Sequence, residues 1–208
     1  MTADRTMVTE RFIPQLPAEL DSDSRAVYES ITGGSRASAA AVTPIVDHDG
    51  RLIGPFGPMV LSPGVGDAVQ RLGEALRFRG TLDPRTREFA ILVVAAEQRS
   101  GFEWIAHVRA GRQHGLSPGD VESLLAGRRS GDPHLGRVER LLQSLARTGT
   151  LADETFADAV SQLGQSAVAE LVWLHGYYTM LATALRVFDP PVPESATAVF
   201  SDQTDFPD

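Results

Sequence analysis

Apolar residues recur at helical spacing along most of this chain, and alternation of apolar and polar residues is almost absent. In residues 64–79, Val65, Val69, Leu72 and Leu76 follow one another three or four positions apart, which is the period of one helix face. We therefore predict an all-α protein with about eight helices. The expected helices cover residues 20–32, 64–79, 84–98 and 102–114, a short helix from residue 117, and residues 133–149, 153–163 and 165–188.

Several predicted helices have clear start and stop signals. Asp83-Pro84, Ser117-Pro118 and Asp132-Pro133 each combine a capping oxygen with a proline in the first helical turn. Gly115 and Gly149 follow the last periodic residues of their segments, where a left-handed residue commonly ends a helix. These signals support the helix boundaries that the periodicity indicates.

The chain divides into three parts by composition. Residues 1–50 are punctuated by proline and small residues, which predicts an N-terminal arm and one short helix. Residues 51–193 form the expected helical domain, which opens with a rigid turn at Gly54-Pro55-Phe56-Gly57-Pro58-Met59 and closes at Pro190-Pro191. Residues 194–208 are acidic and are expected to be a mobile tail.

Composition excludes several classes of function. A net charge of −8 argues against nucleic acid, which is bound by basic residues. The chain has no cysteine, so a disulfide scaffold and a thiolate zinc site are excluded. All 19 basic residues are arginine, which excludes a lysine Schiff base and indicates a GC-rich, bacterial genome. The first thirty residues lack a basic start followed by an apolar run, so we expect no signal peptide and a cytoplasmic protein.

The segment from Val168 to Phe188 approaches the length of a membrane span. Glu170, His175 and Arg186 interrupt it, and charged residues inside a span are costly. We therefore expect no membrane contact. Because the segment is apolar nearly all round, we predict a core helix that also takes part in a subunit interface.

One group of residues has the pattern of an acid–base site. Glu103 and His107 are four positions apart, so on a helix they share one face. Glu88 lies in the preceding predicted helix, and a turn at Ser100-Gly101 would fold it back towards them. Two carboxylates and an imidazole that converge inside helices can exchange protons with a substrate.

Three runs of sequence are similar to the carboxymuconolactone decarboxylase-like family of the alkylhydroperoxidase D-like superfamily. The runs are residues 85–92, Phe102-Glu103-Trp104 with His107-Val108-Arg109, and Gly115-Leu116-Ser117. The resemblance covers residues 51–125 and, less closely, 165–193. It implies an alkylhydroperoxidase D-like helical bundle that forms homo-oligomers, as trimers or hexamers.

The resemblance also assigns roles to residues of this chain. Glu88 and His107 stand at the family's glutamate and histidine positions, and Ser100 and Glu103 stand where its peroxidases have two cysteines. Peroxidase chemistry of that kind needs a nucleophilic and a resolving sulfur, and both are missing. The decarboxylase-like branch has a glutamate at the second of these positions. The resemblance therefore implies that Glu88, Glu103 and His107 are catalytic residues of a decarboxylase-like enzyme.

Decarboxylation without a cofactor needs a cation for the substrate carboxylates, a donor for the developing enolate oxygen, and an acid that returns a proton to carbon. We predict a cofactor-independent lyase or isomerase, without a metal, that acts on a small carboxylated lactone or keto acid. The candidates are Arg85, Arg99 or Arg109 for the cation, His107 for the donor, Glu103 or Glu88 for the acid, and Trp104, His175 and Tyr177 as further pocket residues.

Other interpretations of the same residues stay open. Glu88 could pair with a nearby arginine, and Glu103 with His107 could be a surface pair of little energetic weight. His175 could be a core histidine, and Trp104 could serve packing alone. A relative that keeps the helical scaffold for binding or assembly, without catalysis, is the alternative function. A metal site made of two carboxylates and one histidine would be a sparse ligand set.

Overall fold

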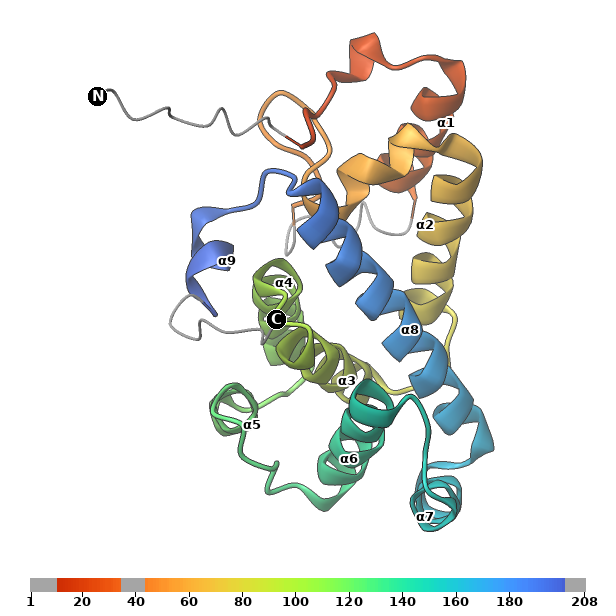
Figure 1. Cartoon of the computed structure of the whole chain (residues 1–208), viewed down its shortest axis with the longest axis vertical. Helices are drawn as coiled ribbons and strands as arrows, with labels where there is room; N and C mark the ends of the chain where they lie inside the picture. Colours follow the sequence, from red (N-terminus) through yellow and green to blue (C-terminus); the bar gives the residue numbers. More distant parts are fainter. Residues whose placement is uncertain (1–10, 35–43, 201–208) are drawn as a thin grey trace, which may run out of the picture.

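Helices make up almost all of the structure, as the sequence predicted (Figure 1). The computed structural model describes residues 11–34 and 44–200. Among these residues the only β-type pairing is one isolated bridge, between Val46 and Leu52. The helices are α1 (Ser22–Gly33), α2 (Pro63–Phe78), α3 (Pro84–Glu97), α4 (Gly101–Gln113), α5 (Pro118–Leu125), α6 (Pro133–Thr148), α7 (Asp153–Leu163), α8 (Gln165–Phe188) and the short α9 (Glu194–Ala198), with 3₁₀ segments η1 (Pro17–Glu19) and η3 (Gly54–Leu61).

The residues that were predicted to start helices cap the helices that follow them. Asp83 and Asp132 accept hydrogen bonds from backbone N–H groups in the first turns of α3 and α6. Ser117 and Asp120 form a reciprocal capping box at the start of α5. At the other end of α6, Gly149 has a φ of 71°, a left-handed conformation that a residue with a side chain adopts only at a cost. Local sequence thus sets where these helices begin and end.

Helix α3 lies at the centre of the fold. Figure 1 shows it enclosed by α4, α6 and α8, and the three helices pack against it. Its residues from Phe89 to Ala95 are all buried, which accounts for the apolar character of this helix around its whole circumference. Leu141 and Leu142 of α6 and Leu171 of α8 complete the core around it.

Helix α2 turns an unexpected face towards the core. The apolar residues that indicated this helix include Val65 and Leu72, whose exposed fractions are 63% and 42%. The buried residues of α2 are instead Gly66, Gln70 and Gly73. A Cβ atom on Gly66 would lie 1.9 Å from the carbonyl oxygen of Met59 in η3, so only glycine permits this close approach. The helix was predicted correctly, but its buried residues are two glycines and a glutamine, while Val69 and Leu76 pack against the core only partly buried.

Segments at both ends of the predicted helical domain belong to the same core. Val27 and Ile31 of α1 are buried, and α1 packs against α2 and η3. The prediction of a mobile tail from residue 194 is wrong for its first part, because α9 lies against α4 (Figure 1). A Cβ atom on Gly101 would lie 1.8 Å from the carbonyl oxygen of Ala196, so glycine at this position allows the contact. Residues 1–10 and 201–208, parts of the predicted arm and tail, lie outside the described residues.

Helix α8 is long and apolar, yet no helix among the described residues is both long and apolar enough to span a membrane. One side of α8 packs against α3, and Leu171, Leu174 and Tyr178 on it are buried. Val172, Trp173, Met180 and Val187 are exposed on the same helix. Exposed apolar residues along a whole helix are a common mark of an interaction surface.

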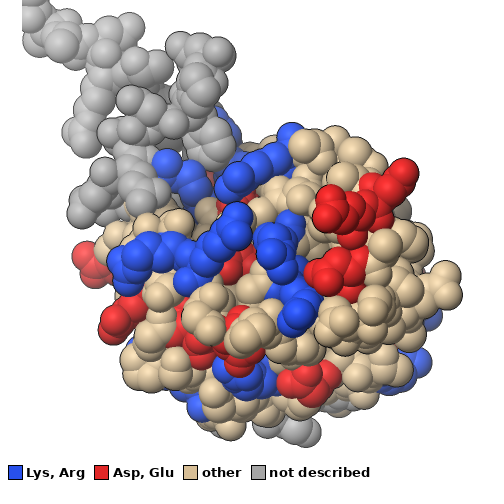
Figure 2. Space-filling view, turned by 90° about the horizontal axis from the view of Figure 1, so that it is seen from below, with Lys and Arg blue, Asp and Glu red and all other residues tan. Residues whose placement is uncertain are grey.

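Charge is unevenly distributed over the surface. Figure 2 shows arginine side chains gathered in a band across one face of the molecule, with aspartate and glutamate side chains beside them. A protein with a net charge of −8 thus still presents locally basic surfaces.

Candidate active site

The hairpin of α3 and α4 brings the predicted acid–base residues together. A tight turn joins the two helices, and Arg99 in this turn has a φ of 52°, in the left-handed region. The backbone N–H of Ser100 donates to the carbonyl oxygen of Ala95 at 2.8 Å, which closes the end of α3. The chain then returns along α3, so that His107 lies beside Glu88 although they are 19 positions apart.

Glu88, His107 and Glu103 form a line of three buried side chains. Nδ1 of His107 lies 2.6 Å from Oε2 of Glu88. Its other ring nitrogen, Nε2, lies 3.4 Å from Oε2 of Glu103, four residues earlier on the same helix. Each of the three residues is at most 4% exposed. The imidazole is therefore held between two carboxylates, as the sequence pattern predicted.

The charges of Glu88 and His107 shift each other's pKa values. Burial raises the pKa of the Glu88 carboxyl, but the charge and hydrogen bond of His107, with Arg77 and Arg87, outweigh burial and lower this pKa to about 2. Burial lowers the pKa of His107, and the two glutamates more than compensate, so the pKa lies above its ordinary value. The interaction between the two groups therefore favours an ionised Glu88 beside a protonated His107. An ionised Glu88 is unsuited to be the proton donor, a role that the sequence left open between Glu103 and Glu88.

Replacing Glu88 with glutamine is expected to lower the pKa of His107 below its value in the unchanged protein. The substitution removes the largest contribution that raises this pKa and leaves burial, which lowers it. A titration of the imidazole followed by NMR measures the change directly. Glu139 offers a matched control, because it is a buried glutamate on α6 that accepts a hydrogen bond from the N–H of Ser130. If Glu139→Gln moved the pKa of His107 as much as Glu88→Gln, the coupling would not be specific to Glu88.

A small cavity of about 30 Å³ adjoins the line of charged residues. Oε1 of Glu103 and Nε of Arg77 are buried and have no hydrogen-bond partner among the described residues. Buried polar atoms normally have a partner, so two such atoms at one cavity indicate where a polar ligand binds. The residues that line the cavity are Arg77, Glu103, His107, Tyr177 and Tyr178, with Ile45, Phe56, Phe102, Ala106 and Leu181.

The cation at this cavity is Arg77, and none of the three predicted arginines lines it. Arg85 forms ion pairs with Asp132 at 2.9 Å and Asp120 at 3.5 Å, so it ties α3 to α5 and α6. Arg99 lines a second cavity, of about 330 Å³, and Arg109 lines a third, of about 100 Å³. None of the three arginines therefore lines the cavity beside His107 in this structure.

Of the further pocket residues predicted, Trp104, His175 and Tyr177, only Tyr177 lines the cavity beside His107. Tyr177 lines the cavity, and the adjacent Tyr178 lines it too and packs edge-on against the His107 ring with centroids 5.2 Å apart. Burial raises the pKa of Tyr178 well above its ordinary value, so this phenol stays protonated. Trp104 is buried against Phe200 and does not line the cavity. His175 is only partly buried and is also absent from the lining.

The spacing of residues in α2 places Arg77 on its buried face, but this spacing alone does not distinguish Arg77 from other arginines of the chain. Arg77 follows Gly66, Gln70 and Gly73 at intervals of three and four, so it continues the buried face of α2. Val69 and Leu76 of α2 also pack against the core, but the exposed Val65 and Leu72 belong to the same apolar pattern, so hydrophobic periodicity does not single out this face. A prediction based on apolar spacing alone therefore does not identify Arg77 as a residue of the inward face.

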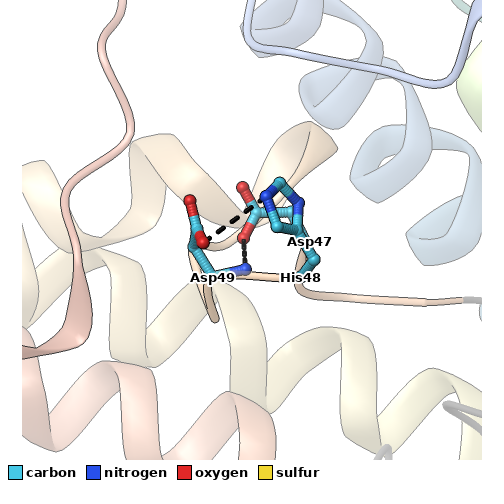
Figure 3. A group of neighbouring side chains, drawn as sticks. All are labelled: Asp47, His48 and Asp49. Atoms are coloured by element: carbon cyan, nitrogen blue, oxygen red, sulfur yellow. Dashed lines mark hydrogen bonds and ion pairs between the residues drawn. The ribbon is translucent and has the colours of Figure 1, made fainter.

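Asp47, His48 and Asp49 are the one group in the described part of the chain whose side-chain atoms lie close enough together to hold a metal ion (Figure 3). They lie on a surface turn, and Oδ1 of Asp47 accepts hydrogen bonds from the backbone N–H groups of Asp49 and Arg51. Arg51 also forms ion pairs with both aspartates. These contacts explain the group as a stabilised turn.

Among curated proteins, none matches the chain significantly. The segment from α2 to α6, which includes the α3–α4 hairpin with Glu88, Glu103 and His107, does match a family. Residues 63–145 match the model of the Carboxymuconolactone decarboxylase family, which confirms the resemblance predicted from the sequence.

Proposed function

We propose that this protein is a cofactor-independent lyase or isomerase that acts on a small carboxylated lactone or keto acid by general acid–base catalysis. The observation that carries the proposal is the buried line of Glu88, His107 and Glu103, which ends at a small cavity where Arg77 supplies a cation. The family match of residues 63–145 supports a decarboxylase-like reaction.

In the proposed reaction, the substrate loses a carboxylate that is conjugated to a carbonyl group. The C–C bond to the carboxylate breaks, CO₂ leaves, and the electron pair moves through the conjugated system onto the carbonyl oxygen as an enolate. A proton from Nε2 of His107 then converts the enolate carbon into a C–H bond. The net change is uptake of one proton and release of one CO₂, so the reaction needs neither an oxidant nor a reductant.

Each residue of the site has a role in this scheme. Arg77 holds the substrate carboxylate, since its Nε is buried without a partner at the cavity. Tyr178, whose phenol stays protonated, donates to the enolate oxygen. Glu88 fixes the orientation of the His107 ring and favours its charged form. Glu103 carries a proton from solvent to Nε2 after each turnover, over a distance of 3.4 Å.

A cavity of about 30 Å³ holds a water molecule but no lactone, so substrate binding requires a side chain to move. Phe102 is the candidate, because its ring lines this cavity and also the two larger cavities beside it. Rotation of the Phe102 ring would join this small cavity to the two larger cavities that Phe102 also lines. The ring fits closely against Gly54, whose missing side chain leaves it room.

A panel of carboxylated lactones and β-keto acids tests the proposed function. We expect the purified protein to release CO₂ from at least one of them, or to exchange a carbon-bound hydrogen for solvent deuterium. The matched esters have no free carboxylate to release as CO₂, and they should exchange hydrogen far more slowly because they lack the carboxylate that Arg77 holds. If no compound reacts, or if esters react as fast as acids, the proposed chemistry is wrong.

The alternative function is a non-catalytic family member that binds a small molecule. The small volume of the cavity favours this alternative, since side chains fill most of the space between α2, α4 and α8. A protein of this kind would bind compounds from the same panel without turnover. A thiol peroxidase is not a candidate, because the chain has no cysteine.

We also propose that the protein is a homo-oligomer, a trimer or hexamer, assembled through α8. Val172, Trp173, Met180 and Val187 expose apolar surface along this helix, and the exposed fraction of Trp173 is 65%. Light scattering after size exclusion is expected to give a multiple of the 22.4 kDa chain mass at micromolar concentration. Trp173→Glu should shift the protein towards the monomer, because a charge within an apolar interface costs binding energy. A monomer without the substitution would contradict this proposal.

A further inference from the structure

The largest cavity described here, of about 330 Å³, lies outside the acid–base line, between the α3–α4 turn, the last turns of α8, and α9. Its volume is at the lower end of the range found for small-molecule pockets, about 300–1,000 Å³. Phe102 separates it from the cavity beside His107, since the same ring lines both. The proposed catalysis uses this larger cavity only as space that opens when Phe102 rotates, so the polar groups of its lining have no assigned function.

The start of α4 gives one wall of the cavity hydrogen-bond donors. Ser100 is the N-cap residue, but its hydroxyl makes no capping bond. The hydroxyl oxygen of Ser100 is buried and has no hydrogen-bond partner among the described residues, and Ser100 lines the cavity. The first N–H groups of a helix have no partner within the helix and carry partial positive charge. An anion at this wall would give a partner to the hydroxyl and to these donors together.

Arg186 supplies a full positive charge to the lining of the same cavity. Arg186 of α8 donates hydrogen bonds to the backbone and side-chain oxygens of Gln98 and to the hydroxyl of Thr183. All three acceptors are neutral, so these bonds fix the guanidinium without neutralising it. Arg99 also lines the cavity, where it donates to the carbonyl oxygen of Phe200. Asp189 is the one carboxylate in the lining, so the side chains there carry a net positive charge.

The remaining lining is apolar. Phe102, Leu185 and Phe200 are its largest apolar side chains, and Ala182, Pro190 and Val192 continue the same surface. A ligand that fits both parts of the cavity has an anionic head and an apolar body. Carboxylate groups suit the combination of an arginine with a serine hydroxyl and helix N–H donors.

We propose that this cavity is a second binding site, specific for small organic acids. The carboxylate binds between the hydroxyl of Ser100, the first N–H groups of α4 and the guanidinium of Arg186. The apolar body packs against Phe102, Leu185 and Phe200. None of Glu88, Glu103 and His107 lines the cavity, so this proposal does not require the proposed catalysis, although the two sites share Phe102.

The probe for the test is 4-fluorophenylacetate, followed by fluorine NMR, with neutral 4-fluorophenylacetamide as its matched comparison. We expect the acid to bind at least tenfold more tightly than the amide. Arg186→Gln should weaken binding of the acid by roughly 10- to 100-fold, because hydrogen bonds to a charged group are strong. Ser100→Ala should weaken binding less, by roughly threefold, and should leave the melting temperature unchanged because no capping bond is lost.

Three further variants serve as controls for where the probe binds. Arg71→Gln removes an exposed arginine of α2 that pairs with Asp67, and it should leave binding unchanged. Glu103→Gln alters the acid–base line and should also leave binding of the probe unchanged. The proposal is wrong if the probe does not bind, if acid and amide bind equally, or if Arg186→Gln has no effect. It is also wrong if Arg77→Gln abolishes binding, because the probe then occupies the cavity beside His107.

Discussion

Replacing Glu103 with glutamine is expected to lower turnover by about 10²- to 10⁴-fold, the contribution typical of a general acid–base group. The substitution exchanges one carboxylate oxygen for an amide nitrogen of similar size, so the packing of this buried residue is kept. It removes the group that supplies protons to Nε2 of His107, 3.4 Å away. His107→Ala should lower turnover at least as much, because it removes the proposed proton donor itself. Steady-state rates on the substrate found in the panel measure both effects.

The pattern across variants separates catalysis from stability. The double variant Glu103→Gln with His107→Ala should be little slower than the slower single variant, because residues that act as one unit are not additive. Glu139→Gln is the matched control, a buried glutamate that should cost stability without a comparable loss of rate. If both single variants keep turnover within about threefold, the magnitude expected of acid–base groups is absent and the site lies elsewhere.

The sequence was sufficient to predict the helices and the convergence of Glu88, Glu103 and His107. The reasons are largely local. Capping oxygens at Asp83, Ser117 and Asp132 act on the next few residues, so they can be found without knowledge of the fold. The spacing of Glu103 and His107 is likewise a property of one helix. Glu88 required one further step, a turn between two helices, and the family resemblance supported it.

The residues that line the cavity beside His107 could not all be predicted, because the lining depends on how separate helices pack. Arg77 comes from α2, whose buried residues are two glycines and a glutamine. Arg85 looked equally suitable in sequence, but two aspartates from later in the chain neutralise it. The packing of α9 depends on the absence of a side chain at Gly101, a long-range contact that no local pattern indicates.

Glu88→Gln is also expected to change how the stability of the protein depends on pH. The pKa of Glu88 falls from 4.5 to about 2 on folding, and at about 1.4 kcal/mol for each pH unit this corresponds to about 3 kcal/mol of stability. Because the unfolded state binds the proton more tightly, this stability is present above pH 4.5 and is lost as the pH falls towards about 2. His107 has the opposite sign. Its pKa is raised on folding, so its contribution is present below its ordinary value of 6.5 and is lost as the pH rises through the raised value.

Urea unfolding of both proteins between pH 2 and pH 9 measures this difference, since the change in stability per pH unit reports the protons bound on unfolding. Asp83, Asp132 and Glu170 also have lowered pKa values, but they are present in both proteins and cancel in the comparison. The advantage of the unchanged protein over Glu88→Gln should therefore grow by about 3 kcal/mol between acid and neutral pH, and shrink again at alkaline pH as His107 loses its proton. The two contributions describe one interaction seen from its two partners, so they are not to be added. A difference between the two proteins that stays constant across this range would show that Glu88 and His107 are not coupled by charge. The site would then be held by packing, and the proposed protonated state of His107 would lose its support.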